Sequence, residues 1–309
     1  MSIENDLITK VVLPLLGTKR RYSTAERTRR HIAKRSARPA RFSPPFGLRR
    51  RATVTPRRVR DWPIYDLEPR SAVPVRHVLY FHGGAYINEI VRSHWAFLGR
   101  LVKEAPCRCV VPIYPLAPRA AATETVAGAA DLARELAAEV GADEVVLMGD
   151  SAGAGIALAV AQSLRDDGAG LNGLVLISPW LDAAVSLPRQ REIAPRDAML
   201  DIPGLAVAGS EYAGDLPVDD PRVSPLHGDL RDLPPITVFT GTEDLLNPDS
   251  HRLRDACAEA GVACEFVEGM GMPHDFPLLP TREGREARRR IVELLRAGRV
   301  SGSSPRAVL

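Results

Sequence analysis

The sequence has few of the residues that build disulfides and metal sites. It holds four cysteines in 309 residues, and none of them forms a Cys-x-x-Cys pair or a set with metal-ligand spacing: Cys107, Cys109, Cys257 and Cys264. We therefore expect buried, reduced thiols of an intracellular protein, without disulfides and without a bound metal.

Long apolar runs are also missing. No window approaches the roughly 18 uninterrupted apolar residues that a membrane span requires. The apolar stretch LITKVVLPLLG (7–17) is interrupted by Lys10 and Pro14 and follows Glu4 and Asp6. A secretory signal would have basic residues first and a longer apolar core after them. The sequence therefore predicts a cytoplasmic protein.

The net charge of +3 conceals an uneven distribution along the chain. Residues 1–60 hold 17 Lys and Arg against 3 acidic residues, whereas the other 249 residues hold 24 basic and 35 acidic residues. A basic N-terminal arm (1–50) either packs on the acidic body as a solvated arginine-rich segment or contacts an anionic surface. We expect the former, with weak membrane-surface contact as the alternative, and no nucleic-acid partner.

Short apolar runs alternate with helical patterns through most of the chain. Helices are expected at 3–16 and at 23–36, the second with Ser23 or Thr24 as N-cap. A hairpin-like pair is expected at 52–60 and 62–69, followed by strands at 75–81, 107–114, 145–149, 171–179, 235–241 and 262–269. This order predicts an α/β fold with a mainly parallel sheet covered by helices on both faces. Residues 182–235 interrupt the alternation and contain no expected strand.

Four of the expected strands are followed by residues that catalysis requires. They are followed by His82-Gly83-Gly84, by Gly149-Asp150-Ser151-Ala152-Gly153, by Gly241-Thr242-Glu243-Asp244 and by Gly271-Met272-Pro273-His274. In a parallel sheet the carboxyl ends of the strands gather at one edge, where functional groups collect. The four loops together therefore predict one active site.

Ser151 is the candidate nucleophile. A serine hydroxyl needs a base and must project free of its neighbours, which a sharp strand-to-helix turn achieves. In such a turn the residues two before and two after the serine come close together, which explains Gly149 and Gly153. The N–H of Ala152 then lies at a helix start and, with the N–H groups of Gly83 and Gly84, predicts an oxyanion hole. His82 is expected to brace this loop rather than to move protons.

His274 is the candidate base, because it alone follows the last strand in a loop. The other histidines are interpreted as surface or packing residues: His31, His77, His94, His227 and His251. Asp244 is the candidate acid, with Glu243 as a competitor and Asp249 better explained as the N-cap of the next helix. The chain order Ser151, Asp244, His274 is that expected of an α/β-hydrolase triad.

In these motifs the sequence resembles the α/β-hydrolase superfamily, in its hormone-sensitive-lipase-like branch of esterases. HGGAY (82–86) is similar to the oxyanion loop of that branch and GDSAG (149–153) to its nucleophile elbow. Further similarities lie in YPLAP (114–118), SPWLD (178–182), GTEDLL (241–246) and HDF (274–276). Ala85 replaces the third loop glycine, and YPLAPRAAATET lacks the acidic and aromatic residues that usually follow.

The resemblance implies an eight-stranded sheet in a catalytic domain (51–309), with a helical cap made from the arm and from residues 182–235. It implies a supporting role for His82 and Asp150. Members of this branch often form homodimers, and the sequence leaves the oligomeric state open. The bacterial proteins most like it include carboxylesterases, epsilon-lactone hydrolases and acetyl-hydrolases of secondary metabolites.

We therefore expect a serine hydrolase that cleaves carboxylic esters of short to medium acyl chains without cofactor or metal. A lactone or an N-acetyl amide remains an alternative substrate. A non-catalytic ligand receptor with the same fold is the alternative from another functional class. Activity on short p-nitrophenyl esters is expected to rise with pH through about 6 to 7, as His274 becomes neutral.

Overall fold

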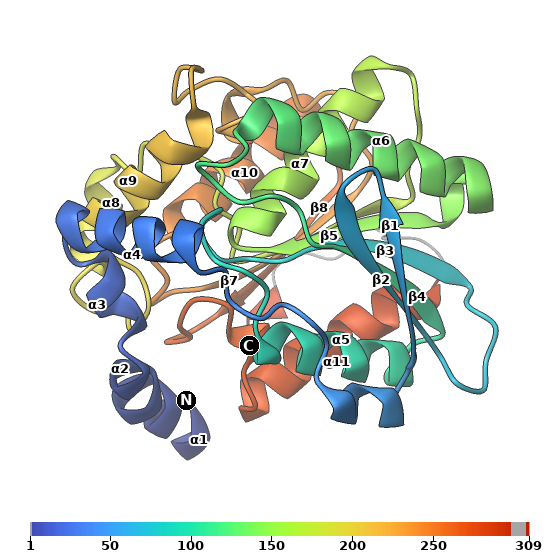
Figure 1. The fold of residues 1–309 in the computed structure, drawn as a ribbon, viewed down its shortest axis with the longest axis horizontal. Coiled ribbons are helices and arrows are strands. Elements are labelled where there is room, and N and C mark those ends of the chain that lie inside the picture. The colour runs from blue at the N-terminus through green and yellow to red at the C-terminus, as the bar shows by residue number, and fades with distance from the viewer. Residues whose placement is uncertain (1, 298–306, 309) are drawn as a thin grey trace.

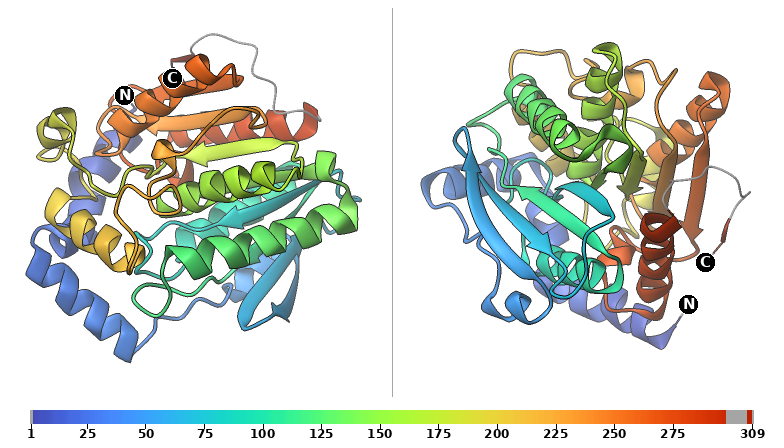
Figure 2. Two further views of the ribbon diagram at one scale, coloured as in Figure 1. Left: turned by 90° about the horizontal axis from the view of Figure 1, so that it is seen from above. Right: turned by 90° about the vertical axis from the view of Figure 1, so that its right-hand side faces the viewer.

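The structure is a computed structural model that describes residues 2–297 and 307–308. A twisted central sheet lies between two layers of helices, and the N-terminal helices cover one end of it (Figures 1 and 2). Residues 298–306 and 309 of the expected catalytic domain lie outside the described residues. Within the described part, no helix combines the length and apolar character needed to cross a bilayer.

The sheet has the strand order β1-β2-β4-β3-β5-β6-β7-β8-β9. The pairs β1/β2 and β2/β4 are antiparallel and all the others are parallel. The expected eight-stranded, mostly parallel sheet is therefore confirmed, with a two-residue ninth strand beside β8. The strands are β1 Thr53–Val59, β2 Trp62–Glu68, β3 Arg76–Phe81, β4 Cys107–Pro112, β5 Val145–Asp150, β6 Gly173–Ile177, β7 Ile236–Gly241, β8 Cys264–Gly269 and β9 Ala307–Val308.

The helices follow the expected alternation. Those of the arm are α1 Ile3–Leu7, α2 Leu13–Leu16, α3 Thr18–Tyr22 and α4 Ala25–Ala37, with a π-helical turn at Ile8–Val12. Those of the body are α5 Arg92–Glu104, α6 Ala122–Val140, α7 Ala152–Asp166, α8 Pro188–Ile193, α9 Ile202–Ala213, α10 Asn247–Ala260 and α11 Arg282–Ala297. Short 3-10 turns lie at Phe46–Arg50, Ala142–Glu144, Pro225–His227 and Phe276–Leu278.

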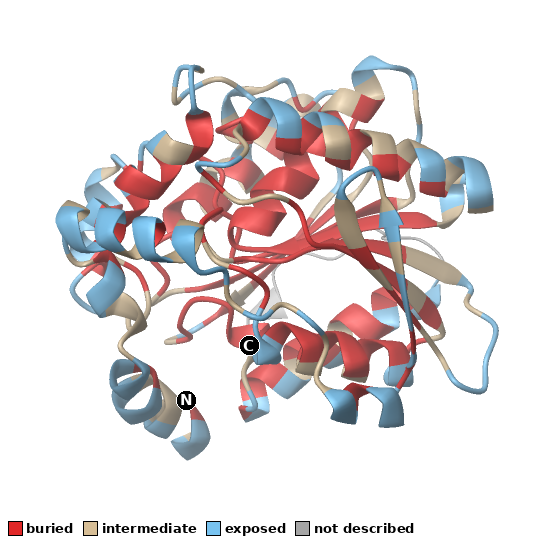
Figure 3. Cartoon of the chain, viewed as in Figure 1, coloured by how far each residue is buried: buried red, intermediate tan, exposed pale blue. Residues whose placement is uncertain are grey.

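Each face of the sheet has its own apolar core (Figure 3). One core joins the sheet to α6, α7 and α10, and the other joins it to α5 and α11. Every residue of β5, β6 and β7 is buried, because helices cover both faces of these central strands. Thr24 caps α4, as expected, since its side chain accepts the N–H of Arg27 at 3.2 Å.

One helix start differs from its prediction. Helix α10 begins at Asn247 with Leu246 at the N-cap, so Asp249 lies in the first turn and is not the cap. The sequence NPD has a proline that fits the first turn of a helix, and the N-cap lies three residues earlier than predicted. Asp249 is completely buried, and its carboxylate lies 3.5 Å from the guanidinium of Arg252.

Candidate active site

The four predicted loops meet at one edge of the sheet. They follow β3, β5, β7 and β8, and of these strands β3 and β5 are neighbours, as are β7 and β8, with β6 between the two pairs. Because all five strands are parallel, their carboxyl ends point the same way. The fold therefore brings the candidate nucleophile, oxyanion loop, acid and base to the same side of the molecule.

Ser151 lies at the turn between β5 and α7 in a conformation that is unfavourable for a side chain. Its φ is 52° and its ψ is −121°. The main chain holds it there, since its N–H donates to the Ile177 carbonyl at 2.8 Å and its own carbonyl accepts the Trp180 N–H at 3.1 Å. Its hydroxyl makes no capping hydrogen bond to α7. The strained turn thus presents a hydroxyl that the helix does not use.

The flanking glycines are required by contact. A Cβ atom on Gly149 would lie 2.4 Å from the Gly153 backbone, and one on Gly153 would lie 2.1 Å from the Phe81 carbonyl oxygen. Both distances are far shorter than a van der Waals contact. The nucleophile turn is therefore packed main chain against main chain on the end of β3, as the sequence pattern predicted.

Asp244 and His274 form a buried pair. The His274 Nδ1 atom lies 3.0 Å from Asp244 Oδ1, and the two residues are 2% and 0% exposed. The N–H of Leu246 donates to the same Asp244 oxygen at 2.9 Å. The other two acid candidates face elsewhere: Glu243 pairs with Arg196 at 2.7 Å, and Asp249 faces Arg252. Among the described residues, Asp244 is the one of the three that contacts His274.

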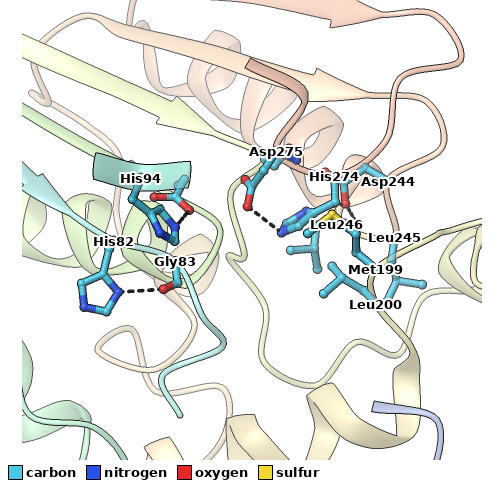
Figure 4. Close-up of polar contacts among 12 residues, drawn as sticks. His82, Gly83, His94, Met199, Leu200, Asp244, Leu245, Leu246, His274 and Asp275 are labelled. Atoms are coloured by element: carbon cyan, nitrogen blue, oxygen red, sulfur yellow. Dashed lines mark hydrogen bonds and ion pairs between the residues drawn. The ribbon is translucent and has the colours of Figure 1, made fainter. Parts of the chain in front are cut away.

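The second nitrogen of His274 faces a residue that the sequence interpretation missed. Its Nε2 atom lies 3.3 Å from Asp275 Oδ2, so His274 is held between two carboxylates (Figure 4). Among the described residues, no hydrogen bond joins His274 to Ser151. The signal was available in the HDF motif, but sequence alone does not say on which side of the imidazole the next carboxylate lies.

These carboxylates dominate the electrostatics of the site. Burial alone would lower the pKa of His274, but the charges of Asp244 and Asp275 and the hydrogen bond that Nδ1 donates to Asp244 raise it to about 10. The expectation that this histidine titrates near 6 to 7 is therefore wrong for the free site. Burial and the charge of Asp244 raise the pKa of nearby Asp197 to about 6. The Oδ2 atom of Asp197 accepts the N–H of Leu245 at 2.8 Å.

The candidate oxyanion loop leaves its donors available. Within the described residues, the N–H groups of Gly83, Gly84 and Ala152 have no main-chain acceptor. A Cβ atom on Gly83 would lie 2.3 Å from a carboxylate oxygen of Asp150, so this loop also needs a bare backbone. His82 braces the loop, with its Nδ1 atom 2.7 Å from the Gly83 carbonyl oxygen. Burial lowers the pKa of His82 to about 4, which keeps it neutral.

His94 is another residue whose place at the site the sequence interpretation missed, because it was counted among the packing or surface histidines. Its Nε2 atom lies 3.0 Å from Asp150 Oδ2, under the oxyanion loop, and the Tyr80 hydroxyl donates to the other Asp150 oxygen. Burial would raise the pKa of Asp150, but His94 and Tyr80 together lower it. Asp150 is therefore ionised and supports the loop from below.

No metal-binding group is found in residues 2–297 and 307–308. No cluster of three or more His, Cys, Asp or Glu side chains could hold an ion there. Cys107, Cys109 and Cys257 are buried, Cys264 is partly buried, and all four are free thiols.

Comparison with known proteins places the chain in a family. A family model described as the alpha/beta hydrolase fold matches residues 78–278. An acetyl-hydrolase of Streptomyces hygroscopicus is 35% identical over 221 residues, which are 69% of this chain and 72% of the relative. An esterase of Acinetobacter venetianus is 31% identical over 204 residues, covering 65% of this chain and 67% of the relative.

A solved structure agrees with these relatives. The crystal structure of an esterase from the bacterial hormone-sensitive lipase family superposes with a TM-score of 0.80 at 27% identity, covering 96% of this chain and 99% of that one. The chain belongs to the α/β-hydrolase family, in its branch of hormone-sensitive-lipase-like ester hydrolases.

Proposed function

We propose that this protein hydrolyses carboxylic esters through Ser151, with His274 as base and Asp244 as the acid that orients it. The observation that carries the proposal is the buried hydrogen bond between Asp244 and His274 at the sheet edge where Ser151 is held in a strained turn. Such strain is costly and is kept where function needs it. The esterase and acetyl-hydrolase relatives support the same chemistry.

The acylation step follows from these groups. Neutral His274 takes the proton from the Ser151 hydroxyl through Nε2 as the oxygen attacks the acyl carbonyl. The negative charge that develops on the carbonyl oxygen is stabilised by the N–H groups of Gly83, Gly84 and Ala152, the last at the positive end of α7. His274 then gives its proton to the departing alcohol, and the acyl group remains on Ser151.

Deacylation reverses the roles. A water molecule loses a proton to His274 and attacks the acyl carbonyl, the same N–H groups hold the oxyanion, and Ser151 regains its proton as the acid leaves. Asp244 stays ionised throughout and stabilises the imidazolium form of His274.

We infer that the arm and residues 182–235 form the cap over this site. Tyr22 of α3 packs on α9, where a Cβ atom on Gly204 would lie 2.3 Å from the Tyr22 Cα atom. The Lys19 ammonium donates to the carbonyls of Ala194 and Asp197, at 2.5 and 2.7 Å. The two segments are therefore joined to each other, and the arm is a structural element with a part in substrate enclosure.

The proposed function is tested by covalent labelling combined with a substrate panel. A fluorophosphonate should add to Ser151 alone, as mass spectrometry of peptides would report, and esters of two to eight acyl carbons should be hydrolysed. Lactones and N-acetyl anilides in the same panel decide the bond class. Failure to label Ser151 in folded protein would remove the proposal, and faster cleavage of the N-acetyl anilide would reassign it to amide hydrolysis.

We also propose that the arm contacts anionic membrane surfaces. Large side chains at four-residue spacing leave an apolar stripe exposed along α1, the π-turn and α2: Ile3 88%, Leu7 56%, Val11 45% and Leu15 81% exposed. A depression next to it is lined by Arg20, Arg21, Arg27, Arg30, His31 and Lys34. An apolar stripe beside cations is complementary to an anionic bilayer surface.

Leu15→Glu is expected to weaken binding of the full chain to vesicles of mixed phosphatidylglycerol and phosphatidylcholine by about tenfold. The reason is that a charge replaces a leucine side chain that would insert into the bilayer interface. Val73→Glu is the matched control, since Val73 is likewise 81% exposed and lies in the β2–β3 loop. Co-sedimentation measures both. Equal binding to purely zwitterionic vesicles, or an unchanged affinity of Leu15→Glu, would contradict the proposal.

A further inference from the structure

Asp275 occupies an unusual place in the site. It follows His274 directly, is 9% exposed, and its Oδ2 atom lies 3.3 Å from the His274 nitrogen that the proposed mechanism uses. Figure 4 shows His274 with Asp275 on one side and Asp244 on the other. The nitrogen that must receive the serine proton therefore faces a carboxylate in the free protein.

The main chain fixes Asp275 in this position. Its φ of 55° is in the left-handed region, which aspartate and asparagine tolerate better than most residues. Its N–H donates to the Ser178 hydroxyl at 2.9 Å, which ties the loop after β8 to the end of β6. The side chain is thus directed inward by a turn and an anchor that do not depend on its own charge.

Among the described residues, the Asp275 side chain makes an ion-pair contact with His274 at 3.3 Å and no hydrogen bond. Its Oδ1 atom is buried and has no donor. The charged and titratable groups that face it are His274 in its own loop, Asp244 after β7, Asp150 at the end of β5 and His94 in α5. Tyr80 in β3 also faces it. Burial, helped by the charges of Asp150 and Asp244, raises the pKa of the Asp275 carboxyl well above its usual range, while His274 and His94 oppose that shift.

We propose that Asp275 is a positioning residue that competes with Ser151 for Nε2 of His274 and holds the free enzyme in a resting state. In that state the imidazolium of His274 forms an ion pair with the Asp275 carboxylate on the Nε2 side, while Nδ1 donates to Asp244. The imidazolium cannot accept the serine proton, so Ser151 is not activated. Turnover begins when Nε2 loses its proton and turns to Ser151. This inference rests on the proposed function and adds its regulation by pH.

The expected consequence is that the rising limb of the pH profile of kcat/KM lies in the alkaline range. The pKa of His274 is raised to about 10, chiefly because the carboxylates of Asp244 and Asp275 outweigh the effect of burial. A base works only when neutral, so kcat/KM, which reports the free enzyme, should rise with pH well above the ordinary histidine range.

Asp275→Asn removes the charge and keeps the shape. The limb of kcat/KM on p-nitrophenyl acetate is expected to move to lower pH by at least about one unit, so that kcat/KM at pH 7 rises about tenfold. Glu243→Gln is the matched control: it removes one nearby charge from a side chain that pairs with Arg196, and its limb should stay with the wild type. A merely structural role would lower the rate and leave the limb in place.

A second readout is independent of turnover. In Ser151→Ala protein, NMR titration of the His274 ring should give a lower pKa when Asp275→Asn is added. If the asparagine variant does not fold, Asp275→Gly keeps the same backbone conformation and replaces it. An unmoved His274 pKa would overturn the inference even if the enzyme is active. Absence of ester hydrolysis at every pH, with the pKa shift intact, would instead contradict the proposed function.

Discussion

Ser151→Ala is expected to lower kcat on short p-nitrophenyl esters by about 10⁵-fold or more, because no other group can form the acyl intermediate. The residual rate should reflect only the oxyanion donors and substrate binding, which together give about 10³-fold over water. Alanine has the same Cβ atom as serine, so the strained turn is no worse for it. The measurement is kcat with and without the substitution under saturating substrate.

Folding is the control for this result. The hydrogen bonds at position 151 are made by its backbone N–H and carbonyl, and Ala keeps both. The thermal midpoint should therefore stay within a few degrees of the wild type. Wild-type turnover by a folded Ser151→Ala protein would eliminate the serine mechanism altogether.

Asp244→Asn should cost about 10⁴-fold in kcat, the size expected when a histidine is held in the wrong tautomer. Leu246 N–H and His274 Nδ1 contact the same Asp244 oxygen, so an asparagine whose NH₂ group takes that place faces His274 Nδ1 with a donor and loses the Leu246 hydrogen bond. That contact favours an imidazole with its proton on Nε2. Such a ring cannot accept the proton of Ser151. Rates at several pH values separate this effect from a simple pKa change.

Asp249→Asn is the matched comparison for the acid. Asp249 is equally buried, follows five residues later, and faces Arg252 instead of His274. Its pKa is raised to about 8, chiefly by burial, so the neutral amide resembles its protonated form. We expect kcat within about threefold of wild type. A larger loss from Asp249→Asn than from Asp244→Asn would mean that the wrong carboxylate has been assigned.

The positions of the loops could be predicted because their signals are local. Gly149, Ser151 and Gly153 describe a strand-to-helix turn within five residues, and buried parallel strands appear as short apolar runs. Strand polarity then brings Asp244 and His274 to the edge that holds Ser151. For this reason the motif residues and the sheet could be predicted from the sequence.

The contacts between residues on different elements of the sheet and its helices could not be predicted from the sequence. His94 lies on α5 and meets Asp150 of β5 because α5 covers one face of the sheet near that strand, and no spacing in the sequence encodes that distance. The direction of Asp275 depends on a single left-handed φ and on Ser178, 97 residues earlier. Both residues alter the charge balance around His274 and the oxyanion loop. Their effect on the pKa of His274 could therefore not be predicted from the sequence.

The packing of Gly153 on the Phe81 carbonyl also bears on how this enzyme can change. The spacing between the Ser151 turn and the loop after β3 is set by contact of one backbone with another, and no side chain can be exchanged to adjust it. Laboratory evolution toward new substrates should consequently leave Gly83, Gly149 and Gly153 untouched. Accepted substitutions should accumulate among the side chains of α3 and α9, except at Gly204, where a Cβ atom would lie 2.3 Å from the Tyr22 Cα atom.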